Sequence, residues 1–487
     1  MTSKDKDIFW KLNSLACLAS GLIGRYTIID LRNDATANGK IESVDGFMNV
    51  NMTDVVFTDP GGNEFYFATF FVRDRNIRYI HVPKELHSSS VTFSTKFNIP
   101  LAKMDFLFCD YDFIGFDLDN TLCEYNLNEM VRMEYDVMSD FLVSRGYPRE
   151  KLKADLDDFS VDFMQRGLIL DFERGNVIKL DRNGGIMKAT HGTKPLERDV
   201  ILDVYGPRNM NCPLMVKIKS NLTDAWSPDC LSKYRLLLDY FDIPASLAFA
   251  RCVDVVEERG ENEFMKCGED TIGALRHMYN RAHFPNEQSD YFKNMRADPG
   301  KYIVRSAPRL LNWLKTLRKK KRLFLVTGSN CDLADFVARH SLGPDWRELF
   351  DIVVCFAKKP FFFTGTNDFK EVKDLKEGDT VQKIALGGIY NQGNWQELET
   401  TLKVAAGRPE ARGLYFGDNL VQDVFTPTKL QLCDTVAIVE EMNESHPSSQ
   451  IISSKFWGPM HAEGSWWGNV IKMYPKAFLP SINKLSR

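Results

Sequence analysis

The stretch Phe113–Leu118 is an apolar run that ends in acidic residues, with Asp117 and Asp119 two positions apart. Such a run is typical of a strand that is buried on both faces of a parallel sheet. Similar runs follow at Leu323–Val326 and Leu414–Phe416, each before a polar turn that contains glycine. Glu129–Leu142, after the first run, has the spacing of a helix. Strands of this kind alternating with helices predict a doubly wound α/β domain. The long stretch between the first two runs predicts a large insertion at about residues 146–305.

Polar and charged side chains follow the predicted strands at their carboxyl ends. After Asp117 and Asp119 come Thr327, Ser329, Lys359, Asp418 and Asp423. Ligands of open α/β sheets bind outside the carboxyl ends of the strands, so we expect these side chains to meet at one edge. Burying aspartates is costly unless their charge is compensated, and Mg²⁺ prefers carboxylate and phosphate oxygens. The pattern therefore favours a site for Mg²⁺ and a phosphate group.

These residues, in this order, resemble the four motifs of the haloacid-dehalogenase (HAD) superfamily of aspartate-nucleophile phosphotransferases. The first motif, D-x-D-x-T, is matched by Asp117, Asp119 and Thr121. The other three are matched by Thr327, by Lys359 (with Lys358 as the fallback), and by Asp418 with Asp423. Within the superfamily, three segments resemble the cytosolic purine 5′-nucleotidase branch and its 5′-nucleotidase-domain-containing proteins: Arg166–Thr193, Lys359–Phe362 and Tyr390–Asn394. The likeness extends over about Met104–Trp467.

The resemblance implies an α/β Rossmann-like HAD core with a large inserted cap, and it assigns roles to the motif residues. Asp117 would form an aspartyl phosphate, and Asp119 would protonate the leaving group and then activate water. Mg²⁺ would be held by Asp117, the Asp119 carbonyl and Asp418, with Asp423 and Thr121 behind these ligands. The phosphate would be bound by Thr327, Ser329 and Lys359. The implied substrate is a nucleoside monophosphate or a related small phosphate ester. His191 would line the nucleotide pocket, although an ordinary loop histidine fits the pattern equally well.

The first 86 residues have a different pattern, with short β-branched segments between turns. After a short helix in Leu15–Gly24 and with a turn at Asp34–Gly39, five strands are predicted: Arg25–Leu31, Lys40–Phe47, Asn49–Thr58, Glu64–Val72 and Ile77–Val82. So many short strands predict a small barrel. The Ser-rich stretch His87–Thr95 predicts a linker. We therefore expect a small domain at 1–86, a linker at 87–104, the α/β domain at 105–470 and a tail at 471–487.

The small domain resembles the Sm and Sm-like fold, in particular the D-class-like Sm-like protein of an snRNP. Its first motif is matched by Asp45, Phe47, Met48 and Asn49, with Gly39 upstream; its second is matched by Val72, Arg73, Asn76 and Ile77. The likeness implies a five-stranded barrel, contacts of Phe47, Asn49 and Arg73 with uridine-rich RNA, and ring formation with other Sm or Sm-like subunits. Asp74 departs from the family, which has glycine there. The alternative is that Phe47 and Met48 are core residues and Asn49 a turn residue.

Composition excludes several other classes of protein. Lys and Arg (62) nearly balance Asp and Glu (66), so bulk positive charge does not bind this chain to nucleic acid. The 10 cysteines are scattered without C-x-x-C pairs, which is typical of a reducing compartment and not of a zinc or disulfide framework. The apolar run within Leu15–Gly24 is too short to span a bilayer, so we expect no membrane association and an intracellular protein, cytoplasmic or nuclear. The basic run Lys315–Arg322 is read either as a nuclear-import patch or as a solvated helix end.

Two functional hypotheses remain from the sequence. In the first, the chain is a Mg²⁺-dependent 5′-nucleotidase with an Sm-like RNA-binding or ring-forming module. In the second, it is an snRNP ring subunit that carries a catalytically silent nucleotidase domain. No physical feature of the sequence requires the two modules to be joined, so a third reading is that two gene products have been merged in one chain.

Overall fold

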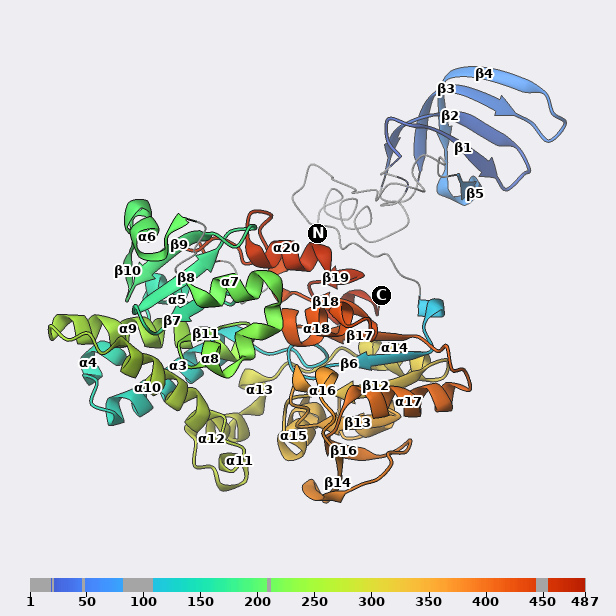
Figure 1. Ribbon diagram of the computed structural model, residues 1–487. Helices are drawn as coiled ribbons and strands as arrows, with labels where there is room; N and C mark the ends of the chain where they lie inside the picture. Colours follow the sequence, from blue (N-terminus) through green and yellow to red (C-terminus); the bar gives the residue numbers. More distant parts are fainter. Residues whose placement is uncertain are drawn as a thin grey trace. The chain divides into compact units, whose positions relative to one another are not determined.

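The computed structural model describes residues 19, 22–45, 49–81, 108–207, 212–443 and 454–486. The chain divides into two compact units, Met1–Leu101 and Ala102–Arg487, which are labelled by element in Figure 1. Phe47 of the predicted RNA site, Met48 of the same motif, the linker 87–104 and most of the predicted helix in Leu15–Gly24 lie outside the described residues. Each unit is described by itself.

The small unit contains a five-stranded antiparallel sheet with the order β4-β3-β2-β1-β5. Its strands are β1 (Tyr26–Leu31), β2 (Thr36–Val44), β3 (Val50–Thr58), β4 (Glu64–Val72) and β5 (Ile77–Ile80). The prediction of a turn through Gly39 was wrong, because β2 already begins at Thr36. A Cβ atom at Gly39 would lie only 2.6 Å from Val55 Cγ2, so this glycine permits close packing between β2 and β3 and is not a turn residue.

The large unit is built on a nine-stranded sheet with the order β15-β14-β16-β13-β12-β6-β17-β18-β19. Its parallel strands are β6 (Phe113–Phe116), β12 (Arg322–Val326), β13 (Ile352–Cys355), β16 (Ile389–Gln392), β17 (Gly413–Gly417), β18 (Asp434–Ile438) and β19 (Ala477–Leu479). An antiparallel hairpin of β14 (Phe369–Lys373) and β15 (Lys376–Thr380) extends one edge. The first strand, β6, therefore lies between strands that come much later in the chain.

Apolar side chains cover both faces of this sheet, as expected for buried parallel strands. Phe113 and Phe324 belong to one apolar cluster, whereas their neighbours Ile114 and Leu325 belong to another. The alternation follows from the two-residue period of a strand. The helices that follow the insertion are α14 (Pro308–Arg318), α15 (Cys331–Ser341), α16 (Phe361–Thr364), α17 (Trp395–Ala406), α18 (Thr426–Lys429) and α20 (Trp466–Met473).

Between β6 and β12 lies a long insertion, defined here as residues 124–307, which ends before α14. It contains a second antiparallel sheet with the order β10-β9-β8-β7-β11: β7 (Ile169–Asp171), β8 (Asn176–Leu180), β9 (Ile186–His191), β10 (Lys194–Pro195) and β11 (Tyr234–Leu236). Its helices are α3 (Leu127–Ser144), α4 (Arg149–Leu152), α5 (Asp158–Phe163), α6 (Arg198–Tyr205), α7 (Pro213–Ser220), α8 (Pro228–Leu231), α9 (Ala245–Glu258), α10 (Phe264–Met278), α11 (His283–Asn286), α12 (Asp290–Ala297) and α13 (Pro299–Tyr302).

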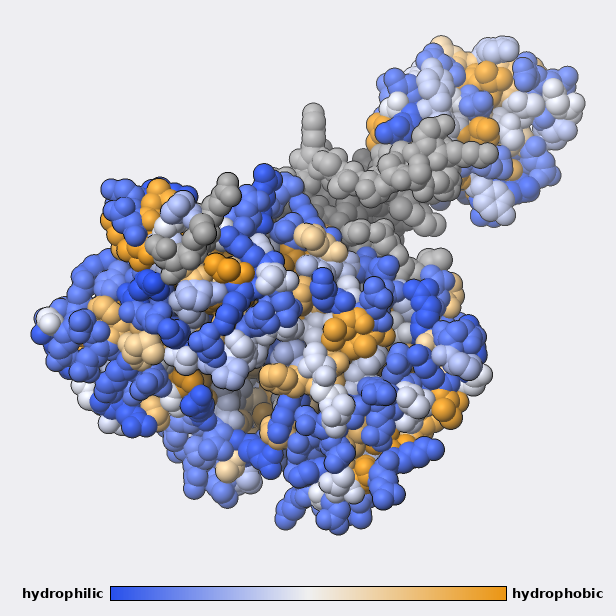
Figure 2. Space-filling view, viewed as in Figure 1, coloured by the Kyte–Doolittle hydropathy of each residue, from blue (hydrophilic) through white to orange (hydrophobic). Residues whose placement is uncertain are grey.

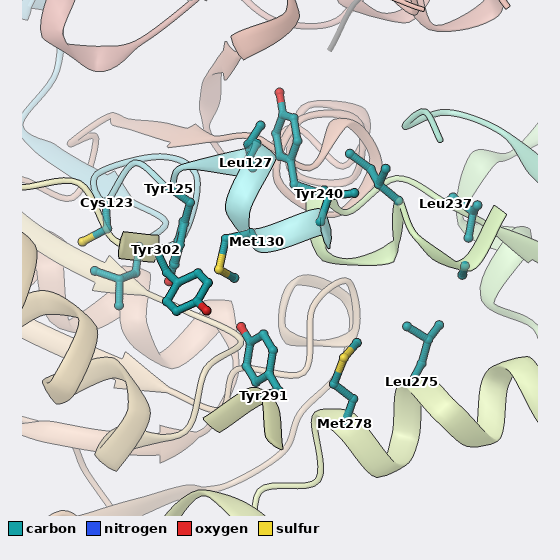
Figure 3. Packing of buried hydrophobic residues seen from close by; sticks show 14 of the residues in the cluster. Cys123, Tyr125, Leu127, Met130, Leu237, Tyr240, Leu275, Met278, Tyr291 and Tyr302 are labelled. Atoms are coloured by element: carbon teal, nitrogen blue, oxygen red, sulfur yellow. The ribbon is translucent and has the colours of Figure 1, made fainter. Parts of the chain in front are cut away.

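The helix predicted at residues 129–142 forms the middle of α3, but it does not cover the nine-stranded sheet as a doubly wound helix would. It packs against α9 and α10 of the insertion. Figure 3 shows this packing, with side chains from the loop after β6, from α3 and from α10 in one apolar cluster. The chain therefore leaves the sheet directly after β6, and the insertion closes over the carboxyl end of that strand.

Charged and polar residues cover most of the face of the large unit seen in Figure 2, with apolar residues in scattered groups. Among the described residues, no helix has both the length and the apolar character needed to cross a membrane.

Candidate active site

The carboxyl ends of β6, β12 and β17 lie side by side, which brings the predicted polar residues to one edge. Phe116 is paired with Leu325 on one side and with Phe416 on the other. The Asp117 N–H donates to the Phe416 carbonyl at 2.8 Å. Parallel pairing in register therefore places the residue after each strand next to the residue after its neighbour. β6 lies between two strands that are reached by separate connections, the kind of position where open sheets bind ligands.

Three buried carboxylates meet at this edge. Asp117, Asp418 and Asp423 each offer an oxygen atom, and these atoms all lie within 4.8 Å of one another. The Lys359 ammonium lies between two of them, with its Nζ 3.0 Å from Asp117 Oδ1 and 2.7 Å from Asp423 Oδ1. When all three carboxylates are ionised, as they are when they bind a cation, they and the one ammonium leave two negative charges in a buried site. We call these four residues the carboxylate cluster.

Burial dominates the electrostatics of the carboxylate cluster. It raises the pKa of Asp117 to about 8, against the opposing effect of the Lys359 ammonium. Burial, together with the nearby carboxylates of Asp239 and Asp117, also raises the pKa of Asp418 well above its usual value. For Lys359, burial alone would lower the pKa, but the carboxylates of Asp117 and Asp423 raise it, so the ammonium stays charged. The cluster thus has a deficit of positive charge.

The donor set fits a hard divalent cation such as Mg²⁺. It consists of carboxylate oxygens, which are the ligands that Mg²⁺ prefers, and its excess negative charge equals the charge of one such ion. Within the described residues, Asp117 Oδ1 is buried and accepts no hydrogen bond, since its contact with Lys359 is an ion pair without hydrogen-bond geometry. Asp423, which we expected behind the ligands, lies within the cluster and pairs with Lys359. Lys358, the fallback for the lysine motif, is exposed, and its Nζ lies 5.3 Å from the Phe356 ring centroid.

The Asp119 carboxylate is surrounded by hydroxyl groups and does not belong to the carboxylate cluster. The Tyr125 hydroxyl donates to Asp119 Oδ1 at 2.6 Å, and the Ser329 hydroxyl donates to Oδ2 at 2.7 Å. The Thr327 hydroxyl lies 3.4 Å from the same Oδ2 and accepts from the Ser329 N–H at 3.0 Å. The loop after β12 and the loop after β6 are thus joined through Asp119.

The turn that follows Asp119 brings Thr121 back beneath the strand end. Asn120 has a φ of 51°, and the N–H groups of Leu122 and Cys123 both donate to the Leu118 carbonyl. Thr121 is 1% exposed, and its Oγ1 forms no hydrogen bond with any described residue. The structure therefore buries Thr121 in the turn after the strand.

A cavity of about 410 Å³ opens beside Asp119, between the sheet edge and the insertion. Eight of its 22 lining residues are aromatic: Tyr125, Trp226, Phe241, Tyr279, Phe284, Tyr291, Phe292 and Phe356. Arg235, Asp239 and Asp242 add charge, and Arg235 Nη2 donates to Asp242 Oδ2 at 2.8 Å. An apolar, aromatic wall with a few charged groups is typical of a small-molecule site.

His191 is not among the residues that line this cavity. It ends β9, where its Nδ1 lies 2.9 Å from Asn176 Oδ1 and its ring contacts Phe264 edge-on at 5.0 Å between centroids. The geometry favours the loop-histidine reading over the nucleotide-pocket reading.

In the small unit, Asn49 joins the two turns that were predicted to bind RNA. Its Nδ2 donates to Asp45 Oδ2 at 2.6 Å, and its Oδ1 accepts from the Asp74 N–H at 3.1 Å. Arg73, directly before Asp74, is exposed. The structure therefore brings Asn49 and Arg73 to adjacent turns and uses the Asn49 amide to hold these turns together.

Comparison with known proteins assigns a family to each of the two units. A model of the 5′ nucleotidase family matches residues 108–450. The chain belongs to this family. A model of the LSM domain matches residues 18–82, so the small unit is an Sm-like domain.

The curated relatives of this 5′ nucleotidase family member match most of the chain. Human 5′-nucleotidase domain-containing protein 1 is 33% identical over 380 residues, which is 74% of this chain and 81% of the relative. Rat 5′-nucleotidase domain-containing protein 2 is 28% identical over 322 residues, 65% of this chain and 54% of the relative. Among solved structures, a chain of the NatC complex bound to CoA matches 14% of this chain and 86% of its own length, at 25% identity and a TM-score of 0.13, too low to support an argument.

Sequence reasoning missed the residues of this 5′ nucleotidase family member that the insertion contributes to the site. Tyr125 binds Asp119, and Arg166 donates to the Asp418 carbonyl at 3.0 Å. Neither residue follows a predicted strand or belongs to a periodic pattern. For Arg166, the only signal in the sequence was its place at the start of the segment that resembles the nucleotidase branch.

Proposed function

We propose that the chain is a Mg²⁺-dependent phosphohydrolase of the HAD type, a 5′-nucleotidase that hydrolyses nucleoside monophosphates through an aspartyl phosphate. The carboxylate cluster supports this proposal most strongly, because it joins a nucleophile, a lysine and excess negative charge at one sheet edge. The part of the insertion at about residues 146–305 would serve as the cap. Family membership and the names of the relatives support a nucleotidase-type hydrolase.

The cavity beside Asp119 supports a nucleotide as substrate. Its aromatic wall can stack on a base, and Arg235, Asp239 and Asp242 can hydrogen-bond polar groups of the base or sugar. The phosphate would then reach the loop of Thr327 and Ser329 and the Lys359 ammonium. A volume of about 410 Å³ accommodates a ligand of drug-like or nucleotide size.

In the first half-reaction, the carboxylate of Asp117 attacks phosphorus in line with the ester bond. A bond forms between the Asp117 oxygen and phosphorus while the bond from phosphorus to the sugar oxygen breaks, and Asp119 transfers its proton to that oxygen. Lys359 and Thr327 stabilise the charge on the phosphoryl oxygens.

In the second half-reaction, Asp119 takes a proton from water, and the water oxygen attacks phosphorus. The bond between Asp117 and phosphorus breaks, which releases inorganic phosphate and restores the Asp117 carboxylate and the protonated Asp119. Tyr125 and Ser329 hold the Asp119 carboxylate in place through their hydroxyl groups. Asp117, the Asp119 carbonyl and Asp418 would hold Mg²⁺, with Asp423 beside them in the carboxylate cluster and Thr121 behind them. The ion would supply positive charge to the phosphoryl oxygens.

For the small unit we propose a second function, contact with uridine-rich RNA and with other Sm or Sm-like subunits. The adjacent turns of Asn49 and Arg73 support the RNA contact. The edge strands β4 and β5 support assembly with other subunits, because within the described sheet each pairs on one side only.

We propose domain limits at 1–86 and 105–470, with a linker at 87–104, a tail at 471–487, a cap insertion at about 146–305 and an intracellular location.

Phosphate release from IMP, GMP and AMP, with and without Mg²⁺, tests the enzymatic proposal. Asp117→Asn should abolish release, and removal of Mg²⁺ by a chelator should do the same until Mg²⁺ is restored. Asp379→Asn on β15, which exchanges an exposed carboxylate, is the matched control and should retain full activity. Equal rates for Asp117→Asn and the wild type, or no release from any of the three nucleotides, would exclude the proposal in favour of a silent nucleotidase domain.

The proposal that both modules act in one molecule is tested on the protein from its native source. An intact species near 55.8 kDa supports a single chain, whereas two smaller species indicate two merged gene products. Full-length protein should bind a uridine-rich RNA more tightly than an adenine-rich RNA of equal length, and Arg73→Ala should reduce this difference.

A further inference from the structure

Arg166 is a buried arginine that joins the insertion to the nine-stranded sheet. It follows α5, and its side chain is 1% exposed. Its Nε donates to Glu441 Oε1 at 2.7 Å and its Nη2 donates to Glu441 Oε2 at 2.9 Å. Glu441 lies in the short helix η9 (Glu440–Met442), which follows β18. The two parallel hydrogen bonds fix the plane of the guanidinium group.

The remaining nitrogen of the Arg166 fork points at the residue that follows β17. Nη1 donates to the Asp418 carbonyl at 3.0 Å and lies 3.6 Å from Asp418 Oδ2. The Asp418 carboxylate thus has a positive neighbour at one side but no close ion pair with it. It remains available to a ligand in the carboxylate cluster.

Tyr240 supports the Arg166 fork from the insertion side. The guanidinium carbon lies 4.0 Å from the centroid of the Tyr240 ring. The Tyr240 hydroxyl, which points away from the apolar cluster in Figure 3, donates to Glu441 Oε2 at 2.5 Å and accepts from the Glu440 N–H at 3.0 Å. The ring and the hydroxyl group of Tyr240 together hold the Arg166 guanidinium group in one position.

The balance of charge argues against the idea that Arg166 neutralises the carboxylate cluster. Glu441 compensates the positive charge of Arg166, so the pair adds no net charge beside Asp418. A buried ion pair is also weak evidence for stability, since apolar replacements of similar size are often as stable. What the pair provides is orientation, because it fixes the backbone of Asp418 and the direction of its side chain.

We propose that Arg166 is the positioning residue of Asp418, and that its fork with Glu441 sets the affinity of the carboxylate cluster for a divalent cation. Arg166 comes from the insertion and Asp418 from the sheet, so the cluster attains its binding geometry only when the insertion is seated on the sheet edge. The inference rests on the proposed function for the identity of the cation.

Binding of Mg²⁺ to the full chain by isothermal titration calorimetry tests the proposal without a substrate, and Mn²⁺ binding by electron paramagnetic resonance provides a second readout. Arg166→Lys keeps the charge but removes the fork, and it should raise the dissociation constant roughly 10- to 100-fold, the usual effect of losing a residue that orients a metal ligand. Arg251→Lys is the matched control. Arg251 also lies in the insertion and donates to Tyr135 Oη and Ser160 Oγ, both at 2.8 Å, and neither residue belongs to the cluster.

The double variant Arg166→Met with Glu441→Gln separates positioning from stability. It removes both charges at once, so it should unfold close to the wild-type midpoint while its cation affinity stays weakened. Wild-type affinity in this variant or in Arg166→Lys would overturn the proposal. If Arg166→Lys fails to fold, Tyr240→Phe is the variant to measure. It removes one hydrogen bond to Glu441 and should weaken cation binding about 3-fold. Unchanged binding in this variant would overturn the proposal. A wild-type chain that binds neither cation would refute the cation site itself, and this proposal with it.

Discussion

Gly417, the last residue of β17, is the position where the smallest change should disturb the candidate site most. A Cβ atom there would lie 2.3 Å from Asp423 Cβ and 2.5 Å from Asp423 Cγ, whereas ordinary contacts begin at 3.4 Å. Asp423 cannot rotate away from this overlap, because the clash is at the root of its side chain. Its N–H also donates to the Asn419 carbonyl at 2.9 Å within the π-helical turn η8 (Leu420–Phe425).

Gly417→Ala must therefore displace Asp423 by about 1 Å, which is the difference between these distances. A shift of this size breaks the 2.7 Å contact with Lys359 and leaves the ammonium to move toward Asp117. A misplacement of about 1 Å typically costs on the order of 100-fold in rate, and overpacking of a core costs about 1–3 kcal/mol of stability. We expect kcat for nucleotide hydrolysis to fall by about that factor, with a modest loss of stability.

The assay measures phosphate release and urea denaturation side by side. Gly273→Ala in α10 is the control, because its Cβ would lie 3.4 Å and 3.5 Å from the Phe141 ring, at ordinary contact distances. The control should keep both activity and stability. A Gly417→Ala enzyme with wild-type kcat would refute the claim that the contact between Asp423 and Lys359 positions the lysine for catalysis.

Three further predictions concern pH, the sheet and the small unit. Burial, with the Asp242 carboxylate, raises the pKa of Asp239 from 3.8 to about 7, so the folded state keeps a proton that the unfolded state loses between these values. The free energy of unfolding should therefore fall as pH rises through this window. Asp239→Asn should remove this part of the pH dependence, which urea denaturation of the variant and the wild type at pH 4 and pH 8 would show. The same change in the free energy of unfolding between these pH values in both proteins would contradict the prediction. Gly115→Ala would place a Cβ 2.1 Å from the Phe324 ring and should cost about 3 kcal/mol in urea denaturation, whereas an unchanged midpoint would show that the sheet can adjust. Asn49→Ala removes the acceptor of the Asp74 N–H, so hydrogen exchange of that amide should become at least 10-fold faster, and equal exchange rates would mean that the turn is held by other contacts.

The residues of the sheet edge could be predicted from the sequence because one rule locates them all. Asp117, Thr327 and Asp418 each follow a buried parallel strand, and parallel strands in register end at the same edge. Lys359 likewise follows a parallel strand, β13. The structure brings all of these residues together, although no distance between any two of them could be predicted from the sequence.

Residues of the insertion could not be predicted in this way, because nothing in their spacing encodes a position relative to the sheet. Tyr125 reaches Asp119 from a loop, and Glu441 reaches Arg166 across 275 positions of the chain. The helical spacing at residues 129–142 correctly predicted a helix, but it did not identify α9 and α10 as the helices that α3 packs against. Helical periodicity identifies the apolar face of a helix without identifying the surface that this face covers.

The balance of charge explains why Lys359 and Arg166, the two buried cationic side chains described near the carboxylates, have different roles. Lys359 contacts Asp117 and Asp423 directly and lowers the negative charge of the cluster to two units. Arg166 lies 3.6 Å from Asp418, but its charge is compensated by Glu441. Without Glu441, three carboxylates would face two cations, and the remaining single negative charge would no longer match a divalent ion. Glu441 binds Arg166 and Tyr240 and not the carboxylate cluster, yet on this reasoning it decides which charge the cluster can hold. Glu441→Gln alone should therefore weaken Mg²⁺ binding more than the double variant with Arg166→Met, and the reverse order in calorimetry would contradict this account of the site.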